Sequence, residues 1–180
     1  CSGITVGSLT VNADDTSEIN ADTGAASVAA SFGAVGASVS VGLALAENEI
    51  DNMVEAYIKN AADLTTSVGG VTVTADETAE IEALTAAASA AVSVSIGGSA
   101  SVALTKAENT LTSTVAAYIQ ASDQVQSAGA VLVSANDRST ISSEIVSVSL
   151  SAGLISLAVG VTLADNTISD ILVNGPKQVY

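Results

Sequence analysis

The chain lacks histidine and tryptophan, and it holds one phenylalanine, one proline, one cysteine and four lysine or arginine residues among 180. Without histidine, imidazole acid–base catalysis and histidine-ligated metals are excluded. A single thiol forms neither an intramolecular disulfide nor a cysteine zinc site. With 19 acidic residues and a net charge of -15, the chain offers no cationic surface for nucleic acid. The composition argues against most classes of enzyme, and we expect no catalytic residues and a structural role.

Small side chains dominate what is present. Ala, Ser, Thr and Val supply 98 of the 180 residues, while 48% of the chain is hydrophobic and 2% is aromatic. Such a chain buries a core, but it lacks the side-chain volume for a thick one. The sequence therefore predicts a narrow interior.

Three copies of a unit of about sixty residues follow one another. A Gly-x-Val/Leu-x-Val-x-Ala signature begins at Gly7, Gly69 and Gly129, with spacings of 62 and 60. A second signature, Ala-Glu/Asp-Asn, recurs with spacings of 61 and 57. Repeats of fixed period indicate a repeat architecture. We predict one solenoid segment over residues 1–180, with units at about 7–68, 69–128 and 129–175.

Apolar and polar residues alternate in each unit, as in residues 71–75, 38–45 and 92–96. A period of two with many β-branched residues predicts strands with one buried face. Residues 76–91, rich in Ala and Glu, also suit a helix. The matching segment 139–151 is rich in Ser, Val and Ile without helical spacing, so strands are favoured in all three units.

The strand pattern predicts an all-β fold, a parallel β-helix. A unit of sixty residues is too long for one coil of three short strands, and it suits about three coils of roughly twenty residues each. Eight or nine coils at about 4.8 Å would make a rod near 40 Å long. Asn48, Asn109 and Asn166 recur once per unit and suit solenoid turns. At three coils per unit they would lie about 14 Å apart, so no asparagine ladder is expected. A β-sandwich or barrel is the alternative fold.

These motifs resemble the repeats of large bacterial filamentous-haemagglutinin-like and leukotoxin-like filamentous adhesins, exported by type V secretion. The resemblance runs from about Gly7 to Ile171 and is broken by Pro176 and Lys177. It implies a right-handed parallel β-helix, outside the cell or at the bacterial surface, within a much longer polypeptide. Its motifs are low in complexity, so they indicate an architecture rather than an activity.

Acidic clusters are the candidates for a binding site. Calcium prefers carboxylate oxygens, whereas solvated acidic faces would simply keep a solenoid soluble. The Gly-Gly-x-Gly-x-Asp calcium signature is absent, and the third unit has fewer acids. We expect no cofactor or metal, with calcium as the alternative. The calcium candidates are Asp14, Asp15, Glu18, Asp76, Glu77 and Glu80.

Membrane attachment has two possible sources. Cys1-Ser2-Gly3 matches the start of a processed bacterial lipoprotein, so Cys1 is a lipidation candidate, although a cut in a longer chain gives the same start. Uncharged runs at 24–46, 83–105 and 145–164 reach membrane-spanning length. These runs are poor candidates for transmembrane helices, because Ser and Thr recur at every second position. Transmembrane β-hairpins suit the alternation better. We expect no membrane contact except through a lipid on Cys1.

Catalysis on glycans is not expected, because sugar sites need aromatic platforms and a cation near the substrate. Tyr57 and Tyr118 recur at one repeat position, which indicates packing or a strand end. Flat Thr-x-Thr arrays, typical of ice binding, do not recur in every unit. We predict a stalk or fibre segment of a surface adhesin, partnered by neighbouring repeats, by identical subunits stacked end to end, or by a cell-surface receptor. The alternative is an extracellular calcium- or glycan-binding module.

Overall fold

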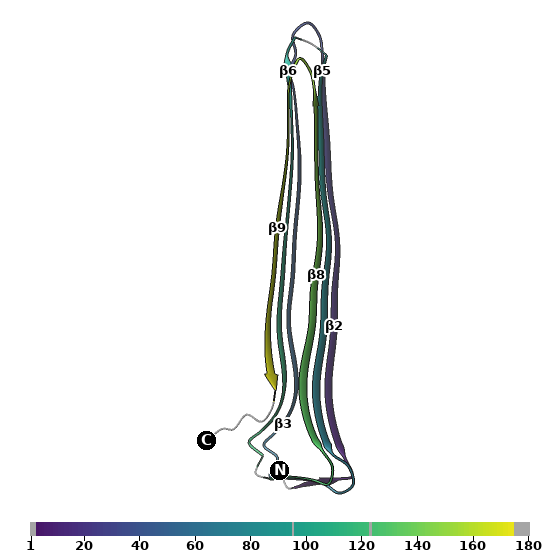
Figure 1. Cartoon of the computed structure of the whole chain (residues 1–180), viewed down its shortest axis with the longest axis vertical. Helices are drawn as coiled ribbons and strands as arrows, with labels where there is room; N and C mark the ends of the chain where they lie inside the picture. The colour runs from purple at the N-terminus through teal and green to yellow at the C-terminus, as the bar shows by residue number, and fades with distance from the viewer. Residues whose placement is uncertain (1–2, 95, 123, 175–180) are drawn as a thin grey trace.

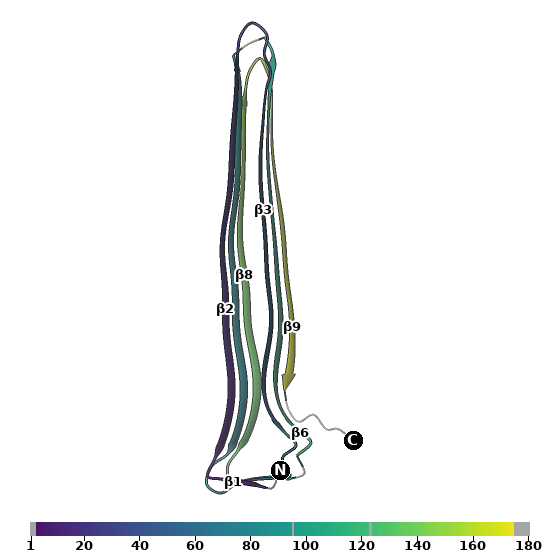
Figure 2. The same ribbon diagram turned by 180° about the vertical axis from the view of Figure 1, so that it is seen from behind.

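The computed structural model describes residues 3–94, 96–122 and 124–174, and every regular element in them is a β-strand. Two long sheets face each other, and a short sheet crosses one end of the molecule (Figures 1 and 2). In chain order the strands are β1 (Ile4–Val6), β2 (Leu9–Phe32), β3 (Ser38–Lys59), β4 (Asp63–Thr66), β5 (Val71–Val94), β6 (Gly98–Gln120), β7 (Gln124–Ser127), β8 (Val131–Ala152) and β9 (Ile155–Asn174).

Each long sheet contains one strand from each repeat unit, whereas the short sheet contains β1 from before the first unit, β4 from the first unit and β7 from the second. The orders are β1-β4-β7, β2-β5-β8 and β3-β6-β9, and all pairings are parallel. The chain thus winds as a parallel β-helix of three coils. The prediction of an all-β solenoid made from three repeats is confirmed.

The number of coils per unit differs from the prediction of about three. Leu9 pairs with Val71, and Val71 pairs with Val131, so one sixty-residue unit is a single coil. The prediction assumed short strands, but β2 and β5 each have 24 residues, whereas most strands have about 5–6. Alternation continues through the acidic stretch without a turn.

The long axis of the molecule therefore runs along the strands (Figure 1). A strand of 24 residues spans about 79 Å at about 3.3 Å per residue. Three coils measure only about 10 Å from first to last strand at about 4.8 Å per step. The expected rod of eight or nine stacked coils is wrong: the molecule is long across its stacking direction.

Turns at both ends reverse the chain. At the end far from the short sheet, which we call the tip, Gly33 has a φ of 144°, a backbone conformation that glycine tolerates. At the opposite end, the base, Asn60 and Ala121 have φ values of 57° and 49° and occupy matching positions after β3 and β6. Asparagine adopts this left-handed conformation readily. The recurring Asn48, Asn109 and Asn166 lie within strands instead.

Side chains alternate inward and outward along every long strand. The base half of the interior has an apolar cluster that includes Leu64, Val71, Val73 and Val115, all fully buried. Towards the tip it holds Ala, Ser, Thr and Gly, such as Ala87 and Ala103. The narrow interior predicted from composition is present. The core is not purely aliphatic, because buried Ser and Thr side chains contribute hydroxyl groups to it.

The middle coil is more buried than the coils on either side. Val73 and Ile81 of β5 have no exposed surface, whereas their partners Val11 and Ile19 in β2 remain partly exposed. Strands β2 and β3 end the two long sheets on one side, and β8 and β9 end them on the other. The described part of the chain contains no helix long and apolar enough to span a membrane.

Candidate functional site

Two features of the fold are candidates for function. The first is the pair of open coil edges, β2 with β3 and β8 with β9. The second is a polar layer inside the base half, where acidic side chains of one sheet face Asn and Ser of the other. The layer lies between the apolar base cluster and the cluster of Ile50, Ile81 and Leu111.

The acidic side of this layer is one row across three strands. Asp15 of β2 pairs with Glu77 of β5, and Glu77 pairs with Asp137 of β8. Facing them is the row of Asn52, Ser113 and Asp170 in β3, β6 and β9. Their positions have the inward parity of the neighbouring buried aliphatic residues. We call these six residues the internal acidic layer.

Asn52 joins the two sheets at this level. Its Nδ2 donates to Oδ2 of Asp15 at 2.8 Å and to Oε1 of Glu77 at 3.0 Å. Glu77 has no exposed surface. Among the described residues, Oε2 of Glu77 and the buried Oγ of Ser113 have no hydrogen-bond partner. Unpartnered buried polar atoms cost stability, so this layer is less stabilising than the apolar layers around it.

Burial raises the pKa of the Asp170 carboxyl, and the charges of Asp137 and Glu77 raise it further. A carboxyl whose folded pKa exceeds its unfolded pKa binds protons more readily in the folded state. Its stabilising contribution is therefore complete below the unfolded pKa, about 3.9. That contribution is lost as pH rises through the folded pKa.

An Asp170→Asn variant should melt at a higher temperature than the wild type at pH 7, because it removes a charge that opposes folding. The difference should vanish near pH 3. Thermal unfolding followed by circular dichroism measures both. Asp165→Asn is the matched control, since Asp165 lies on the same strand with the outward parity. Equal gains for both variants would mean that net charge, not the internal acidic layer, sets the effect.

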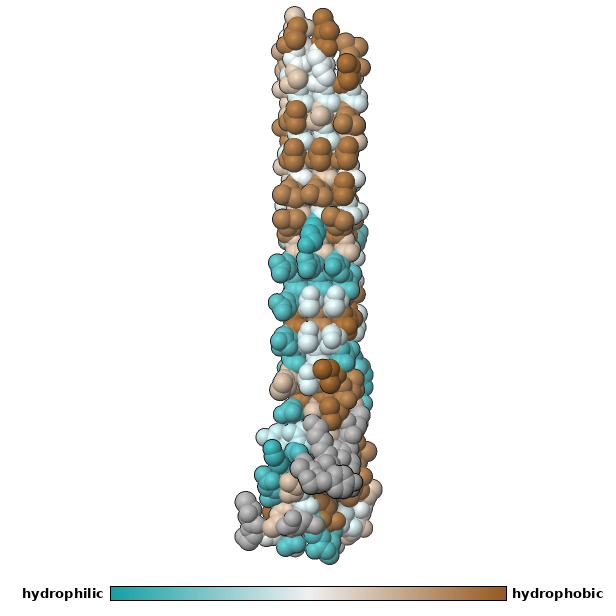
Figure 3. Space-filling view, turned by 90° about the vertical axis from the view of Figure 1, so that its left-hand side faces the viewer, coloured by the Kyte–Doolittle hydropathy of each residue, from teal (hydrophilic) through white to brown (hydrophobic). Residues whose placement is uncertain are grey.

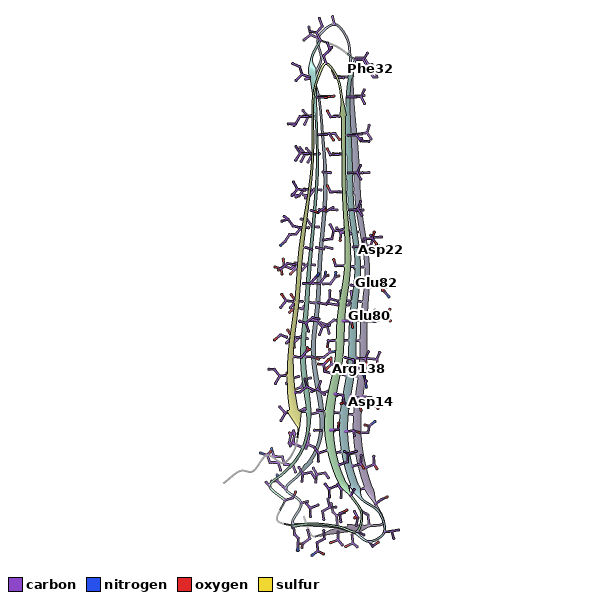
Figure 4. The ribbon with its side chains drawn as sticks, viewed as in Figure 1. Asp14, Asp22, Phe32, Glu80, Glu82 and Arg138 are labelled. Atoms are coloured by element: carbon purple, nitrogen blue, oxygen red, sulfur yellow. The ribbon has the colours of Figure 1, made fainter. Side chains whose placement is uncertain are left out.

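The six calcium candidates do not form one group. Asp15 and Glu77 lie in the internal acidic layer, whereas Asp14, Glu18, Asp76 and Glu80 point outward. Asp14 and Glu80 are seen on the outer face of the β2-β5-β8 sheet (Figure 4). Within the described residues no three His, Cys, Asp or Glu side chains are grouped to hold a metal ion. Calcium binding stays an untested alternative, and Cys1, the lipidation candidate, lies outside the described residues.

Sequence reasoning did not place Asp137 and Asp170 inside the fold because it interpreted the acidic stretches as solvated faces or calcium sites. Strand parity identifies them: Asp15, Glu77 and Asp137 each lie four positions after the buried or partly buried Val11, Val73 and Val133. Once the strand is continuous, an even spacing places the carboxylates on the same inner face.

The recurring asparagines form a ladder, contrary to the expectation that they would not touch. Nδ2 of Asn48 donates to Oδ1 of Asn109 at 2.7 Å, and Nδ2 of Asn109 donates to Oδ1 of Asn166 at 2.7 Å. The expectation was wrong because it placed three coils between successive copies. Tyr57 and Tyr118 also meet, with ring centroids 5.3 Å apart and planes 9° apart, so the packing role expected for them is confirmed.

No protein-family model, curated protein or solved structure matches the chain. Its function is therefore inferred from the geometry of the coil edges and of the interior.

Proposed function

We propose that the chain is a structural segment of a bacterial surface or secreted adhesin, extended by further coils stacked on its two open edges. The further coils come from the same polypeptide or from identical subunits. The role is mechanical, and the cell-surface receptor would lie outside this segment. The resemblance of the repeats to filamentous adhesins supports the proposed location, and the coil edges support the stacking.

The observation that carries the proposal is the match between the two edges. An open edge presents unpaired backbone groups that another strand can pair with. Several corresponding inward positions on the first and third coils hold the same residue, including Ile19 with Ile141 and Asn48 with Asn166. The third coil of one chain therefore offers the first coil of the next chain a surface similar to the one that the middle coil offers within the chain.

The chain ends are compatible with such continuation. Ala117 pairs with Asn174, and seven residues separate Ala117 from Val125, the residue of β7 that is equivalent to Ile4. A direct head-to-tail fusion of two chains would place nine residues between Asn174 and the next Ile4. Nine residues reach across the same gap, so the fusion does not need an added linker.

Stability of a solenoid is approximately a sum over repeats and their interfaces. The tandem fusion should therefore melt at a clearly higher temperature than the single chain, in one cooperative transition. Thermal unfolding by circular dichroism measures this. A tandem that melts at the temperature of the single chain would contradict stacking.

One substitution placed in either copy supplies the control. Ile141→Lys in the first copy puts a charge between stacked coils, whereas the same change in the second copy remains on an open edge. Ile141→Lys in the first copy should lower the melting temperature of the tandem fusion more than the same change in the second copy. Equal losses would show that the edges do not pair.

A further inference from the structure

The polarity of the outer surface differs between the tip half and the base half of the molecule. The tip half of the molecule is formed by residues 24–45, 86–105 and 146–163, and none of these residues is charged. We call this half the apolar end. Outward side chains there are mostly aliphatic, and the space-filling view shows brown rows of hydrophobic residues above a more hydrophilic base half (Figure 3). Lys106 and Glu108, joined by a salt bridge of 2.5 Å, mark the border on one sheet.

Both long sheets are apolar outside at this end. On the β3-β6-β9 sheet, Val41 is 60% exposed and Leu157 is 61% exposed. On the opposite sheet, Val28 is 81% exposed and Leu150 is 64% exposed. The tip turns are apolar as well. The exposed tip residues are Phe32, Val35, Ile96 and Leu154.

The polar groups of the apolar end point inward and bind one another. Ser89 and Ser101 contact across the two sheets with their hydroxyl oxygens 2.6 Å apart, and Ser27 and Ser40 do so at 2.7 Å. Oγ of Ser149 donates to the backbone oxygen of Ser101 at 2.8 Å. This arrangement reverses that of a water-soluble strand pair, since its hydroxyl groups are inside and its aliphatic groups outside.

The length of the apolar end matches a lipid bilayer. Nine residues of β2, from Gly24 to Phe32, span about 30 Å at about 3.3 Å per residue. The hydrocarbon core of a bilayer is about 30 Å thick, and a strand crosses it with about 9–11 residues. Exposed apolar patches of this extent mark interaction sites.

We propose that the apolar end inserts into the hydrocarbon of a lipid bilayer, with the acidic base half in water. A second copy packed face to face would cover one sheet and leave the other sheet and the tip turns exposed. Hydrocarbon covers both sheets and the tip together. This differs from the expectation of no membrane contact, which weighed the uncharged runs before their serines were known to point inward.

Insertion depends on the coil stacking of the proposed function, because backbone groups at an open edge are not satisfied by lipid. Neighbouring coils would pair those edges within the hydrocarbon. The same pairing would supply the first coil with partners for Ser31 and Ser38, whose inward hydroxyl groups have none among the described residues. Lipid binding and stacking are measured separately, so failure of one is distinguishable from failure of the other.

The test is flotation of the full chain with phosphatidylcholine vesicles on a density gradient. The wild type should float with the vesicles. A Leu43→Asp/Val161→Asp variant should lose at least about tenfold in partitioning, since charges facing lipid cost up to a few kcal/mol each at mid-depth. Both residues lie in one outward row, with Leu104 between them.

Met53→Asp/Ile171→Asp is the matched control. It adds the same charge to the same two strands, on the same outer face and in one row with Thr114, but in the base half. It should float like the wild type. Equal losses for both double variants, or a wild type that stays at the bottom of the gradient, would overturn the proposal. The proposal would also be overturned if the wild type formed oligomers without lipid and only the Leu43→Asp/Val161→Asp change dissociated them.

Depth is measured with a single tryptophan, since the chain has none. Val35→Trp places the reporter at the tip, and Val68→Trp places it at the base, where Val68 is 83% exposed. On addition of vesicles the emission of the tip reporter should shift to shorter wavelength, and that of the base reporter should not change. A shift at the base alone, or at both positions, would overturn the proposed orientation.

Discussion

A Gly42→Val variant is expected to lose about 2–3 kcal/mol of unfolding free energy, at the upper end of the usual cost of overfilling a packed interior. Gly42 lies in β3 with its Cα facing β5. A Cβ atom at this position would lie 2.6 Å from the backbone oxygen of Ala88 and 3.2 Å from its carbonyl carbon. Ala88 has little freedom to move away, because β5 is bonded on both sides by β2 and β8.

The residues in the same row show why the sheets are so close. Gly42 pairs with Ala103, and Ala103 pairs with Gly160. A Cβ atom at Gly160 would be 3.1 Å from Oγ of Ser147. The row accepts nothing larger than a methyl group, so a branched side chain has to push the sheets apart.

Gly24→Val is the matched control for this prediction. Gly24 is also within a long strand of the first coil, but it points outward and has no atom within 4 Å of an added Cβ. Valine there should leave the stability unchanged or raise it by up to about 1 kcal/mol, because glycine is unfavourable inside strands. Guanidinium unfolding followed by circular dichroism compares the two variants. Similar stabilities would mean that the sheets lie farther apart than the Gly42–Ala88 contact requires.

An Asn109→Asp variant should be destabilised at pH 7 by about 3–5 kcal/mol, the usual cost of an uncompensated buried charge. Asn109 is 1% exposed and sits between Asn48 and Asn166 in the ladder. A carboxylate still accepts from Nδ2 of Asn48. It has no N–H for Oδ1 of Asn166, so two acceptors would face each other without a proton.

The loss should depend on pH. Burial and the facing acceptor raise the pKa of the introduced carboxyl above its unfolded value of about 3.9. The variant should therefore regain stability as pH falls towards 4, where the protonated acid donates to Oδ1 of Asn166. Asn20→Asp adds the same charge on the exposed face of β2 and should show neither the large loss nor the recovery. A loss at Asn109 that is unchanged between pH 7 and pH 4 would contradict the ladder.

Much of the fold could be predicted from the sequence. The alternation of residues 71–75 identifies a strand, and the spacings of 62, 60, 61 and 57 are the register offsets of the paired strands. The recurrence of Tyr57 and Tyr118 anticipates their stacking. These inferences succeed because the repeat places equivalent residues directly above one another.

The size of the coil could not be read in the same way. Nothing in residues 9–32 ends the strand, but a run of 24 residues far exceeds the usual strand length. The prediction therefore divided each unit into about three coils of short strands. That step hid the asparagine ladder and the internal acidic layer, since both depend on neighbouring coils being one full unit apart. Gly42 is within a strand because the opposite sheet approaches too closely for any other residue.

The orientation of the uncharged runs also required the structure. Alternating Ser and Val give the same pattern whichever set is buried, and burial of the aliphatic set is the usual outcome in water. In the apolar end the serines face inward, and at Gly42 the opposite sheet lies too close for a larger side chain. The β-hairpins considered for these runs do not form, because β2 and β3 lie in different sheets and each pairs in parallel with a strand of the next coil.

A coil of sixty residues has a mechanical consequence. Each coil adds about 4.8 Å of height, so this architecture uses about three times as many residues per ångström as a solenoid with twenty-residue coils. The product of stacking would be a flat ribbon about 79 Å wide, the length of its long strands. A ribbon of that cross-section resists bending in the plane of its sheets and yields across its thin dimension.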